Sequence, residues 1–547
     1  MPRAIDLYSG VGGWSLGLRL SGVEVVASYE QWGPANETNF KNNLHQAQTV
    51  DIRRLALADL PKDIEIVVGS PPCTQFSYSN RGGGGDIADG LRDVKCFLAI
   101  VDHLKPRVWA MENVPRVAKI IEAELQTGGA LEQFAHLDCV THIVDMADYG
   151  LPQRRRRCIA GNFDISLLES YRATTKQLLL GDVIRSLTRE PAADPMFGMS
   201  IPQERLTDHV EEDVLNSEEV RINKANKTTH TIYNAMPFPD PLDKTVRTIT
   251  ATCTRVSRES VVIATDSDQS EFRRLTLRER ASLQGFPITF QFYGTSYSQK
   301  LRMIGNAVPP SFSYLIGHAL QDHPVEDLMA LSEVAKGLVT PVPAPAVTPP
   351  ERAGARYPLN RTFRFAIPNL QLKSGVRFEF RNDHRGPLVT WGVAFYFGNS
   401  KAIHSVQLDH TLYQHLKCAM SSQLEKAVAG LLDDVSRYVA AADIRNLQAV
   451  WAHQGPGGTR AFMLLDKFNE TGLSLSNALV GYEEEAERLI ASAIEYQFHA
   501  DLGDIPGVPK LLRNAPLVLA GLLLGSRINP ILAKNGPETG LARSLRP

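Results

Sequence analysis

The sequence predicts an α/β protein, with a doubly wound, Rossmann-like sheet in its N-terminal part and a separate α+β domain in its C-terminal part. Residues 3–17 contain a short apolar run, a glycine turn and an amphipathic pattern, which is typical of the first strand and helix of such a sheet. Later apolar runs end in polar or reactive side chains. A proline-rich stretch over residues 340–350 separates the two parts of the chain.

Length and composition indicate a multidomain cytoplasmic protein. A chain of 547 residues exceeds a single hydrophobic core, so we expect two or three domains. We expect no leader and no membrane segment, because no charged-then-apolar start is present and the apolar stretch 515–525 is too short to cross a bilayer. Since the formal net charge is only −2, a nucleic-acid site would have to be a local basic surface.

The cysteines are scattered along the chain without the paired spacing of metal ligands. We therefore expect reduced thiols, no disulfide framework and no metal site. The six cysteines are Cys73, Cys96, Cys139, Cys158, Cys253 and Cys418.

The first strand leads into a glycine turn at Gly10, Gly12 and Gly13, where missing side chains let a ligand approach the backbone. Ser15 stands where the dinucleotide fingerprint requires its third glycine. The turn therefore favours a nucleoside ligand without pyrophosphate over a nicotinamide dinucleotide.

Acidic residues follow the next two strands. The strand over 24–29 ends in Glu30, about 20 residues after the glycine turn, where a carboxylate can accept both hydroxyls of a ribose. Asp51, followed by Ile52, is suited to an adenine amino group. These positions predict a nucleoside pocket at the carboxyl edge of the sheet.

The fourth strand presents a candidate nucleophile. The apolar run 66–68 is stopped by the rigid turn 69–72, which places Cys73 at the carboxyl edge of the sheet. A thiol held beside a cationic group can lose its proton and become nucleophilic. The glycine-dense residues 80–90 predict a loop that either closes over a substrate or is a plain surface loop.

Two further features lie at the same edge. After a helix over 96–104, the strand over 108–111 ends in Glu112. Four consecutive arginines, residues 154–157, precede another strand; such a run is also typical of a solvated face. Because side chains alternate along a strand, only one pair, Arg155 and Arg157, need enter the site.

The remaining chain divides by its patterning. Residues 165–270 lack regular alternation of strand and helix, and their basic and hydroxyl residues concentrate over 244–258. We expect four parts: a catalytic domain formed by 1–164 and 271–330, a recognition region over 165–270, a semi-rigid linker over 331–353, and an α+β domain over 354–547. The last part offers no nuclease motif, phosphate loop or His/Cys cluster.

Taken together and in order, these residues resemble the DNA (cytosine-5) methyltransferases over roughly residues 1–325. The matching positions are Asp6, Leu7, Tyr8, Ser9, Gly10, Gly12, Gly13, Glu30, Asp51, Ile52, Pro71, Pro72, Cys73, Glu112, Asn113, Val114, Gln153, Arg155, Arg157, Arg274, Leu275, Thr276, Gln284, Gly285, Phe286, Pro287 and 305–310.

The resemblance implies a Rossmann-like methyltransferase sheet that binds S-adenosylmethionine, a target-recognition region that binds double-stranded DNA, and a last helix folded against the first. It further implies a prokaryotic or phage modification enzyme, with Tyr8 stacked on the adenine. The cofactor residues it implies are Asp6, Tyr8, Ser9, Gly10, Gly12, Gly13, Glu30, Asp51, Ile52, Pro72, Asn306 and Val308. The DNA-binding residues we predict are Ser77, Gln153, Arg247, Arg255 and Arg258.

The chemistry supplies its own reason for the catalytic residues. Cytosine C5 is a poor nucleophile, so a thiolate, here Cys73, must first add to C6. Negative charge on the ring then requires an acid at N3 and a guanidinium at O2, for which Glu112 and Arg157 are suited, with Arg155 in support. The base must leave the duplex to be reached.

Two departures from the family pattern concern packing around the ligands rather than the reaction. Thr74 separates the nucleophile from Gln75, although the family has glutamine directly after the cysteine. Gln31 follows Glu30, and Trp32 comes one place later.

Other functions remain open at this stage. Ser70 to Cys73 is similar to the motif of exocyclic-amine methyltransferases, which need no thiolate. A transfer-RNA cytosine-5 methyltransferase, an inactive DNA-binding regulator, and a bifunctional protein whose residues 354–547 form a nuclease or DNA-binding module are further alternatives. The C-terminal domain is also a candidate for self-association or for binding a protein partner.

Overall fold

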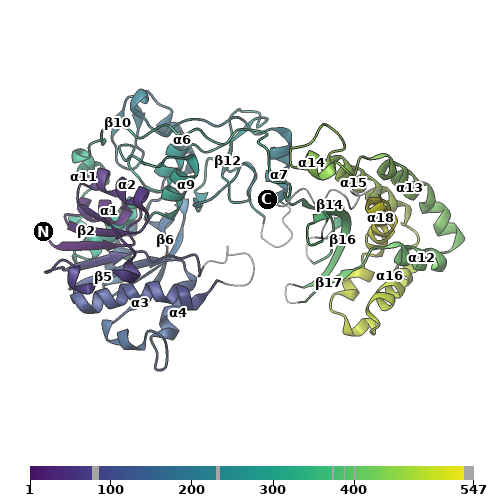
Figure 1. Cartoon of the computed structure of the whole chain (residues 1–547), viewed down its shortest axis with the longest axis horizontal. Coiled ribbons are helices and arrows are strands. Elements are labelled where there is room, and N and C mark those ends of the chain that lie inside the picture. The colour runs from purple at the N-terminus through teal and green to yellow at the C-terminus, as the bar shows by residue number, and fades with distance from the viewer. Residues whose placement is uncertain (77–84, 229–234, 373–374, 387, 400–401, 535–547) are drawn as a thin grey trace. The chain divides into compact units, whose positions relative to one another are not determined.

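The computed structural model describes residues 1–76, 85–228, 235–372, 375–386, 388–399 and 402–534. Two compact units are present (Figure 1). Unit 1 comprises residues 1–228 and 236–353, and unit 2 comprises residues 229–235 and 354–547.

Unit 1 is built on a mixed seven-stranded sheet with the order β3-β2-β1-β4-β5-β8-β6. Strands β3, β2, β1, β4 and β5 run parallel, and β8 runs antiparallel to both β5 and β6. The strands are β1 (Arg3–Leu7), β2 (Glu24–Glu30), β3 (Gln46–Thr49), β4 (Ile66–Gly69), β5 (Val108–Asn113), β6 (Val140–Asp145) and β8 (Arg156–Gly161). This sheet confirms the predicted α/β fold class.

Helices cover both faces of this sheet. Alternate side chains of β1 and β4 enter opposite cores, with Ala4 and Ile66 on one side and Ile5 and Val67 on the other. Helices α1 and α10 pack in the first core, and α3 and α4 pack in the second (Figure 1). The helices around the sheet are α1 (Gly13–Leu20), α2 (Gly33–Asn43), α3 (Ile87–Leu104), α4 (Arg116–Glu124), α9 (Tyr297–Asn306) and α10 (Pro310–Ala319).

The last helix folds back against the first, as the resemblance implied. The Ser313 hydroxyl of α10 donates a hydrogen bond of 2.7 Å to the carbonyl of Gly13 in α1. A Cβ atom at Gly13 would lie 1.9 Å from the carbonyl oxygen of Val308, so only glycine permits this approach. The contact brings residues from both ends of unit 1 to one edge of the sheet.

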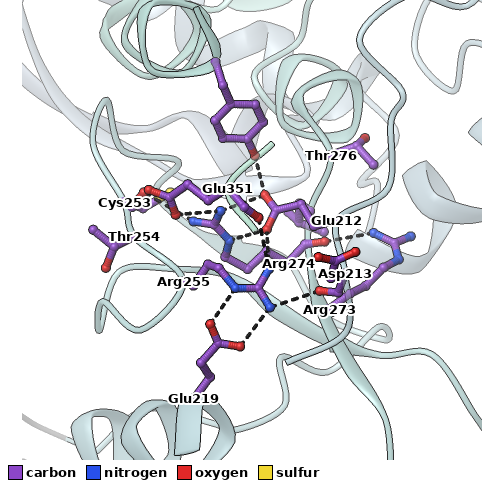
Figure 2. A network of polar contacts seen from close by, with 12 residues as sticks. Glu212, Asp213, Glu219, Cys253, Thr254, Arg255, Arg273, Arg274, Thr276 and Glu351 are labelled. Carbon is purple, nitrogen blue, oxygen red and sulfur yellow. Dashed lines mark hydrogen bonds and ion pairs between the residues drawn. The ribbon is translucent and has the colours of Figure 1, made fainter. Parts of the chain in front are cut away.

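The recognition region contains short elements held together by buried ion pairs. The elements of this region and of the segments that flank it are α5 (Ile165–Ser170), α6 (Leu180–Leu187), α7 (Ser217–Thr228), α8 (Leu277–Leu283), β7 (Gln153–Arg154), β9 (Ala192–Ala193), β10 (Ser200–Ile201), β11 (Val246–Arg247), β12 (Val262–Ala264) and β13 (Phe272–Arg274). Figure 2 shows the central network, in which the Glu212 carboxylate pairs with Arg274 at 2.6 Å and Arg255 at 3.3 Å. Arg255 also pairs with Glu219 at 2.6 Å.

The segment 331–353 packs within unit 1, whereas we expected a linker with few contacts. It includes the short helix α11 (Leu331–Val334). Tyr293 and Lys300 donate 2.9 Å hydrogen bonds to the carbonyls of Pro343 and Ala346. The Glu351 carboxylate lies 3.0 Å from the buried Arg274 guanidinium (Figure 2). The segment therefore supplies partners to two fully buried cations.

Unit 2 contains an antiparallel four-stranded sheet with the order β14-β15-β16-β17 and a group of helices that lie on one side of it (Figure 1). Its elements are β14 (Arg364–Gln371), β15 (Arg377–Asp383), β16 (Thr390–Asn399), β17 (Ala402–Val406), α12 (His410–Ala419), α13 (Ser422–Ala441), α14 (Leu447–Trp451), α15 (Ala461–Ala478), α16 (Glu483–Phe498), α17 (Val508–Leu512) and α18 (Ala515–Lys534). Among the residues that the structure describes, no group of three or more His, Cys, Asp or Glu side chains could hold a metal ion.

Helix α18 is the central helix of unit 2. The helix has 20 residues, nine more than the apolar stretch 515–525 from which we expected no membrane segment. By length and composition it could cross a membrane. However, 67% of its most apolar window is buried inside the protein, as in a core helix. It packs on β16 and α15, and a Cβ atom at Gly521 would lie 2.3 Å from the Phe378 ring.

The contacts of residues 340–353 predict that a truncated protein needs them. Two shortened chains, ending at Val339 and at Ala353, both lack the C-terminal domain and differ only in this segment. We expect the shorter chain to have a free energy of unfolding lower by roughly 3 kcal/mol, because Arg274 and Lys300 each lose a partner of a buried charge. Urea denaturation followed by circular dichroism measures the difference. Equal midpoints for the two chains would contradict the structural role of the segment.

Candidate active site

A cavity of about 520 Å³ opens at the carboxyl ends of β1, β2, β4 and β5. Its position is the one that the strand-end residues predicted. The lining includes Tyr8, Ser9, Gly10, Glu30, Asp51, Ile52, Pro72, Cys73, Glu112, Arg155, Arg157, Asn306 and Val308. The structure therefore brings the four residues predicted as catalytic and most of those predicted for the cofactor into one cavity.

The glycine turn and Glu30 form one end of the cavity. Tyr8, Gly10 and Gly12 have positive φ angles of 53°, 51° and 84°, so the backbone turns sharply after β1. The Glu30 carboxylate accepts hydrogen bonds from the backbone N–H of Gly10 at 3.1 Å and of Trp32 at 2.7 Å. These bonds fix the carboxylate at the cavity wall, where burial raises the pKa of Glu30.

Tyr8 is held by two residues that the sequence analysis did not single out. Its hydroxyl donates to the Asp93 carboxylate at 3.3 Å, and Arg53 lies 2.7 Å from the other oxygen of Asp93. Burial raises the pKa of Tyr8, so the phenol stays protonated. Arg53 follows the predicted Asp51 and Ile52, whereas Asp93 lies on α3, and no sequence spacing links that helix to the cavity.

A second pair missed from the sequence lies at the opposite wall. The Arg302 guanidinium of α9 stands over the Trp32 ring at 4.7 Å, and both residues line the cavity. Trp32 is thus directed to the cavity although it stands one place later than the family pattern. In the sequence, only Trp32 could have indicated this pair. Arg302 lies 270 residues away, so its position in the sequence gave no reason to connect it with Trp32.

Three residues predicted to bind the cofactor lie behind the cavity wall. Asp6 is fully buried and accepts 3.2 and 2.6 Å hydrogen bonds from the backbone N–H and the hydroxyl of Ser15. A Cβ atom at Gly12 would lie 2.0 Å from the Asn39 side chain, and Gly13 contacts Val308 in the same way. These residues shape the turn, and they do not line the cavity in this structure.

Cys73 and Glu112 form the other end of the cavity with Arg157. The Glu112 carboxylate lies 2.8 Å from Nε of Arg157 in a largely buried ion pair. Asn113, the residue after Glu112, donates a 3.0 Å hydrogen bond to the carbonyl of Pro71 and so ties β5 to the turn that carries Cys73. Cys73, Glu112 and Arg157 are therefore positioned by two adjacent strands and their antiparallel neighbour.

The charges around Cys73 oppose one another. Burial raises the pKa of the Cys73 thiol, and the negative charge of Glu112 raises it further. Arg157 and Arg155 act in the opposite direction without cancelling the rise. The thiol is therefore protonated at neutral pH in this state of the site, and Glu112 is the neighbour whose charge has most influence on it.

Arg155 is oriented mainly by backbone carbonyls. Only 2% of its surface is exposed, and it donates hydrogen bonds to the carbonyls of Ala307 at 3.0 Å and Gly305 at 3.3 Å. Burial lowers the pKa of Arg155 to about 9. The neighbouring Arg154 and Arg156 are exposed, so the side chains alternate in this run as expected of a strand.

The predicted DNA-binding residues are placed differently from the expectation. Arg255 and Arg258 are buried, and Arg255 is paired with Glu212 and Glu219, so neither guanidinium is presented at the surface of this structure. Sequence position could not reveal acidic partners 36 to 43 residues away.

The other three positions predicted to bind DNA are Gln153, Arg247 and Ser77. Gln153 is fully buried and bonds the carbonyl of Leu283, which ties β7 to α8 and leaves no surface for DNA. Arg247 is paired with Asp240 and keeps 15% of its side chain exposed. Ser77 lies outside the described residues.

Comparison with known proteins places the site in a wider context. The family model described as "C-5 cytosine-specific DNA methylase" matches residues 2–322. Type II methyltransferase M.HgiDI of Herpetosiphon aurantiacus is 30% identical over 324 residues, which cover 58% of this chain and 94% of the relative. Type II methyltransferase M.HindV of Haemophilus influenzae is 28% identical over 340 residues, covering 60% and 99%.

Among solved structures, a putative DNA modification methyltransferase encoded within an E. coli prophage is similar to 59% of this chain and 99% of its own length. The identity is 21% and the TM-score is 0.45. The S. pombe Dnmt2 methyltransferase is 18% identical with a TM-score of 0.41, covering 59% of this chain and 99% of its own.

Burial of Asp6 predicts a pH dependence of stability. Burial raises the pKa of Asp6 to about 7, whereas an unfolded aspartate titrates near 4. The folded state thus binds the proton more tightly, and this contribution to stability is complete below about pH 4 and lost as the pH rises to about 7. At pH 8 the ionised group costs on the order of 4 kcal/mol.

The Asp6→Asn variant keeps an oxygen to accept both hydrogen bonds of Ser15 but has no charge to bury. The free energy of unfolding of this variant minus that of the unchanged protein should increase by up to about 4 kcal/mol between pH 4 and pH 8. Urea denaturation at a series of pH values measures this difference. Parallel curves for the two proteins would show that Asp6 does not titrate in this range.

Proposed function

This chain belongs to the C-5 cytosine-specific DNA methylase family, and we propose that Cys73 is the nucleophile of its reaction. The protein is a DNA (cytosine-5) methyltransferase that uses S-adenosylmethionine. The observation that carries the assignment of Cys73 is its position in one cavity with the Glu112–Arg157 ion pair and the glycine turn.

The residues around the glycine turn fit the cofactor. Each oxygen of the Glu30 carboxylate accepts one backbone N–H and retains a lone pair for a ribose hydroxyl. Asp51 and Tyr8 offer an acceptor and an aromatic face for the adenine, and Asn306 and Val308 close the opposite side. S-adenosylmethionine supplies an electrophilic methyl group when it is bound there.

Cys73 and its neighbours then carry the chemistry on the cytosine. As the sulfur of Cys73 forms a bond to C6, the Glu112 carboxylate takes up the thiol proton and delivers a proton to N3, while Arg157 donates to O2. The ring becomes an enamine whose C5 takes up the methyl group. Loss of the C5 proton and breakage of the C6–sulfur bond restore the aromatic ring. The cytosine reaches Cys73 only after it is flipped out of the duplex.

The raised pKa of Cys73 gives the ion pair a second function. Before the base arrives, Glu112 is paired with Arg157 and its charge disfavours the thiolate. When N3 and O2 of a cytosine take over these two side chains, the thiol proton passes to Glu112 and the negative charge beside the sulfur disappears. The thiolate is therefore formed when the correct base is present.

The biological setting follows from the relatives. Because the relatives include Type II methyltransferases, modification of a specific DNA sequence in a prokaryote or phage is the best-supported function, carried out in the cytoplasm. Unit 2 is a candidate for self-association or for binding a protein partner. Bisulfite sequencing of DNA and of transfer RNA from cells that express the protein tests the substrate, because methylated cytosines in RNA alone would overturn it.

Replacing the nucleophile should abolish the reaction. In Cys73→Ser the rate of methyl transfer should fall by at least roughly three orders of magnitude, because a hydroxyl is far less nucleophilic than a thiolate. Cys418→Ser is the matched control, since that thiol is exposed on α12 in unit 2. Transfer of radioactive methyl groups to DNA measures the rates.

The same proteins test the covalent bond. The unchanged protein and the control should form a denaturant-resistant adduct with random-sequence duplexes that contain 5-fluorocytosine, because fluorine cannot leave C5 as a proton does. Cys73→Ser should form none. Turnover retained by Cys73→Ser would exclude the covalent mechanism.

The two effects of Glu112 predict opposite changes in one variant. In Glu112→Gln the methylation rate should fall by roughly 10² to 10⁴, because the amide cannot deliver a proton to N3. Alkylation of Cys73 by iodoacetamide at pH 8 should become faster, because the charge that raises its pKa is gone. Mass spectrometry measures the alkylation of each cysteine. A variant in which both rates fall would instead indicate a collapsed pocket.

A further inference from the structure

The sheet of unit 2 has one face covered by helices and one that carries arginines. Phe378 and Phe380 of β15 are fully buried; Phe378 meets Gly521 of α18, and Phe380 packs edge-on against Phe468 of α15 at 5.0 Å. Since side chains alternate along a strand, Arg377, Glu379 and Arg381 lie on the opposite face. Figure 1 shows the helices of this unit on one side of its sheet, and the contacts of the phenylalanines with α18 and α15 place them on that side.

On this opposite face, which we call the arginine face, three arginines surround one tyrosine. Tyr396 of β16 is the direct cross-strand neighbour of Arg377, and its ring lies 4.9, 5.5 and 5.8 Å from the guanidinium groups of Arg377, Arg364 and Arg381. The arginine side chains of the face are 43% exposed at Arg364, 28% exposed at Arg381 and 12% exposed at Arg377. An aromatic ring within a group of exposed cations is typical of nucleic-acid-binding surfaces.

A buried carboxylate orients two of these arginines. Glu379 lies between them with 1% of its side chain exposed, and it accepts from Nε of Arg364 at 2.6 Å and from Nε of Arg377 at 2.7 Å. Within the part of the chain that the structure describes, the terminal Nη groups of these two arginines have no hydrogen-bond partner. Their planar NH₂ groups are therefore fixed in orientation and remain available to an anion.

The charges of the arginine face are not balanced within it. Four arginines, including Arg385, stand against the carboxylates of Glu379 and Asp383, which leaves an excess of two positive charges. Arg364 and Arg381 are direct cross-strand neighbours, and like charges in this arrangement cost stability. Acidic residues gather instead on the helices, where α16 begins with three consecutive glutamates.

We propose that the arginine face is a second DNA-binding surface, which contacts phosphate groups of duplex DNA outside the methylated site. The proposal rests on the DNA substrate of unit 1, because unit 2 belongs to the same polypeptide as a unit that acts on this polyanion. Fixed guanidinium groups suit phosphate oxygens, and no base-specific contact is needed. An acidic protein is the other polyanion that such a face could take, and the test below separates the two.

The test measures DNA binding by the full chain in which two arginines are replaced. Arg364→Gln/Arg381→Gln removes two charges, keeps the length of the side chains, and leaves Glu379 paired with Arg377. The matched control, Lys426→Gln/Arg488→Gln, removes two exposed charges from α13 and α16. Fluorescence anisotropy with a labelled 40-base-pair duplex gives the dissociation constant at a series of NaCl concentrations.

We expect the arginine-face variant to bind DNA about tenfold more weakly at 0.1 M NaCl and its salt slope to fall by up to about 1.8, since each lost phosphate contact removes about 0.9. The control should bind like the unchanged protein. S-adenosylmethionine affinity, measured by calorimetry, and the adduct with 5-fluorocytosine DNA at saturating concentration should be equal in all three proteins, which separates this proposal from the function of unit 1.

Two outcomes would overturn the proposal. The first is an unchanged dissociation constant and salt slope in a folded arginine-face variant, with thermal unfolding as the check on folding. The second is a variant that binds DNA as tightly as the unchanged protein but no longer binds a poly-glutamate peptide that the unchanged protein binds. That result would assign the arginine face to an acidic protein.

Discussion

Unit 1 depends on three arginines that are buried almost completely, Arg155, Arg274 and Arg278. A charge removed from water must be matched by partners within the protein, and these partners come from segments far apart in the sequence. Arg155 donates to carbonyl groups before α10, and Arg278 donates to carbonyl groups of the recognition region and of the segment after α8. Arg274 pairs with Glu212 and with the segment that precedes unit 2. The recognition region is therefore joined to the sheet by obligatory polar contacts as well as by apolar packing.

The same constraint explains why the catalytic side chains keep their places. Arg155 cannot leave the carbonyls of Gly305 and Ala307 without exposing a buried cation, so β8 stays aligned with the turn that carries Asn306 and Val308. Arg157 follows on β8, next to Glu112 on the antiparallel β5. The cavity wall at Asn306 and Val308 and the guanidinium of Arg157, which we propose to bind O2 of the cytosine, are thus positioned through one arginine.

The sequence alone was sufficient for the sheet and for most of the cavity, because the residues that end parallel strands meet at one edge whatever the rest of the chain does. Glu30, Cys73 and Glu112 could be predicted in this way. Ion pairs between distant segments could not: composition marked Arg255 as a candidate for DNA, and only the fold reveals the acidic partners that bury it. The docking of residues 340–353 was equally hidden, since it uses backbone carbonyls, which every sequence possesses.

The two units treat arginine in opposite ways, and this difference separates a structural role from a binding role. In the recognition region Glu212 and Glu219 engage several donors of Arg255, and no guanidinium surface is left for a ligand. On the sheet of unit 2, Glu379 engages only Nε of Arg364 and Arg377, and the Nη groups of these arginines have no hydrogen-bond partner among the described residues. A carboxylate beside an arginine therefore does not by itself argue against nucleic-acid binding. The donors that remain free decide whether the arginine is part of the core or part of a binding surface.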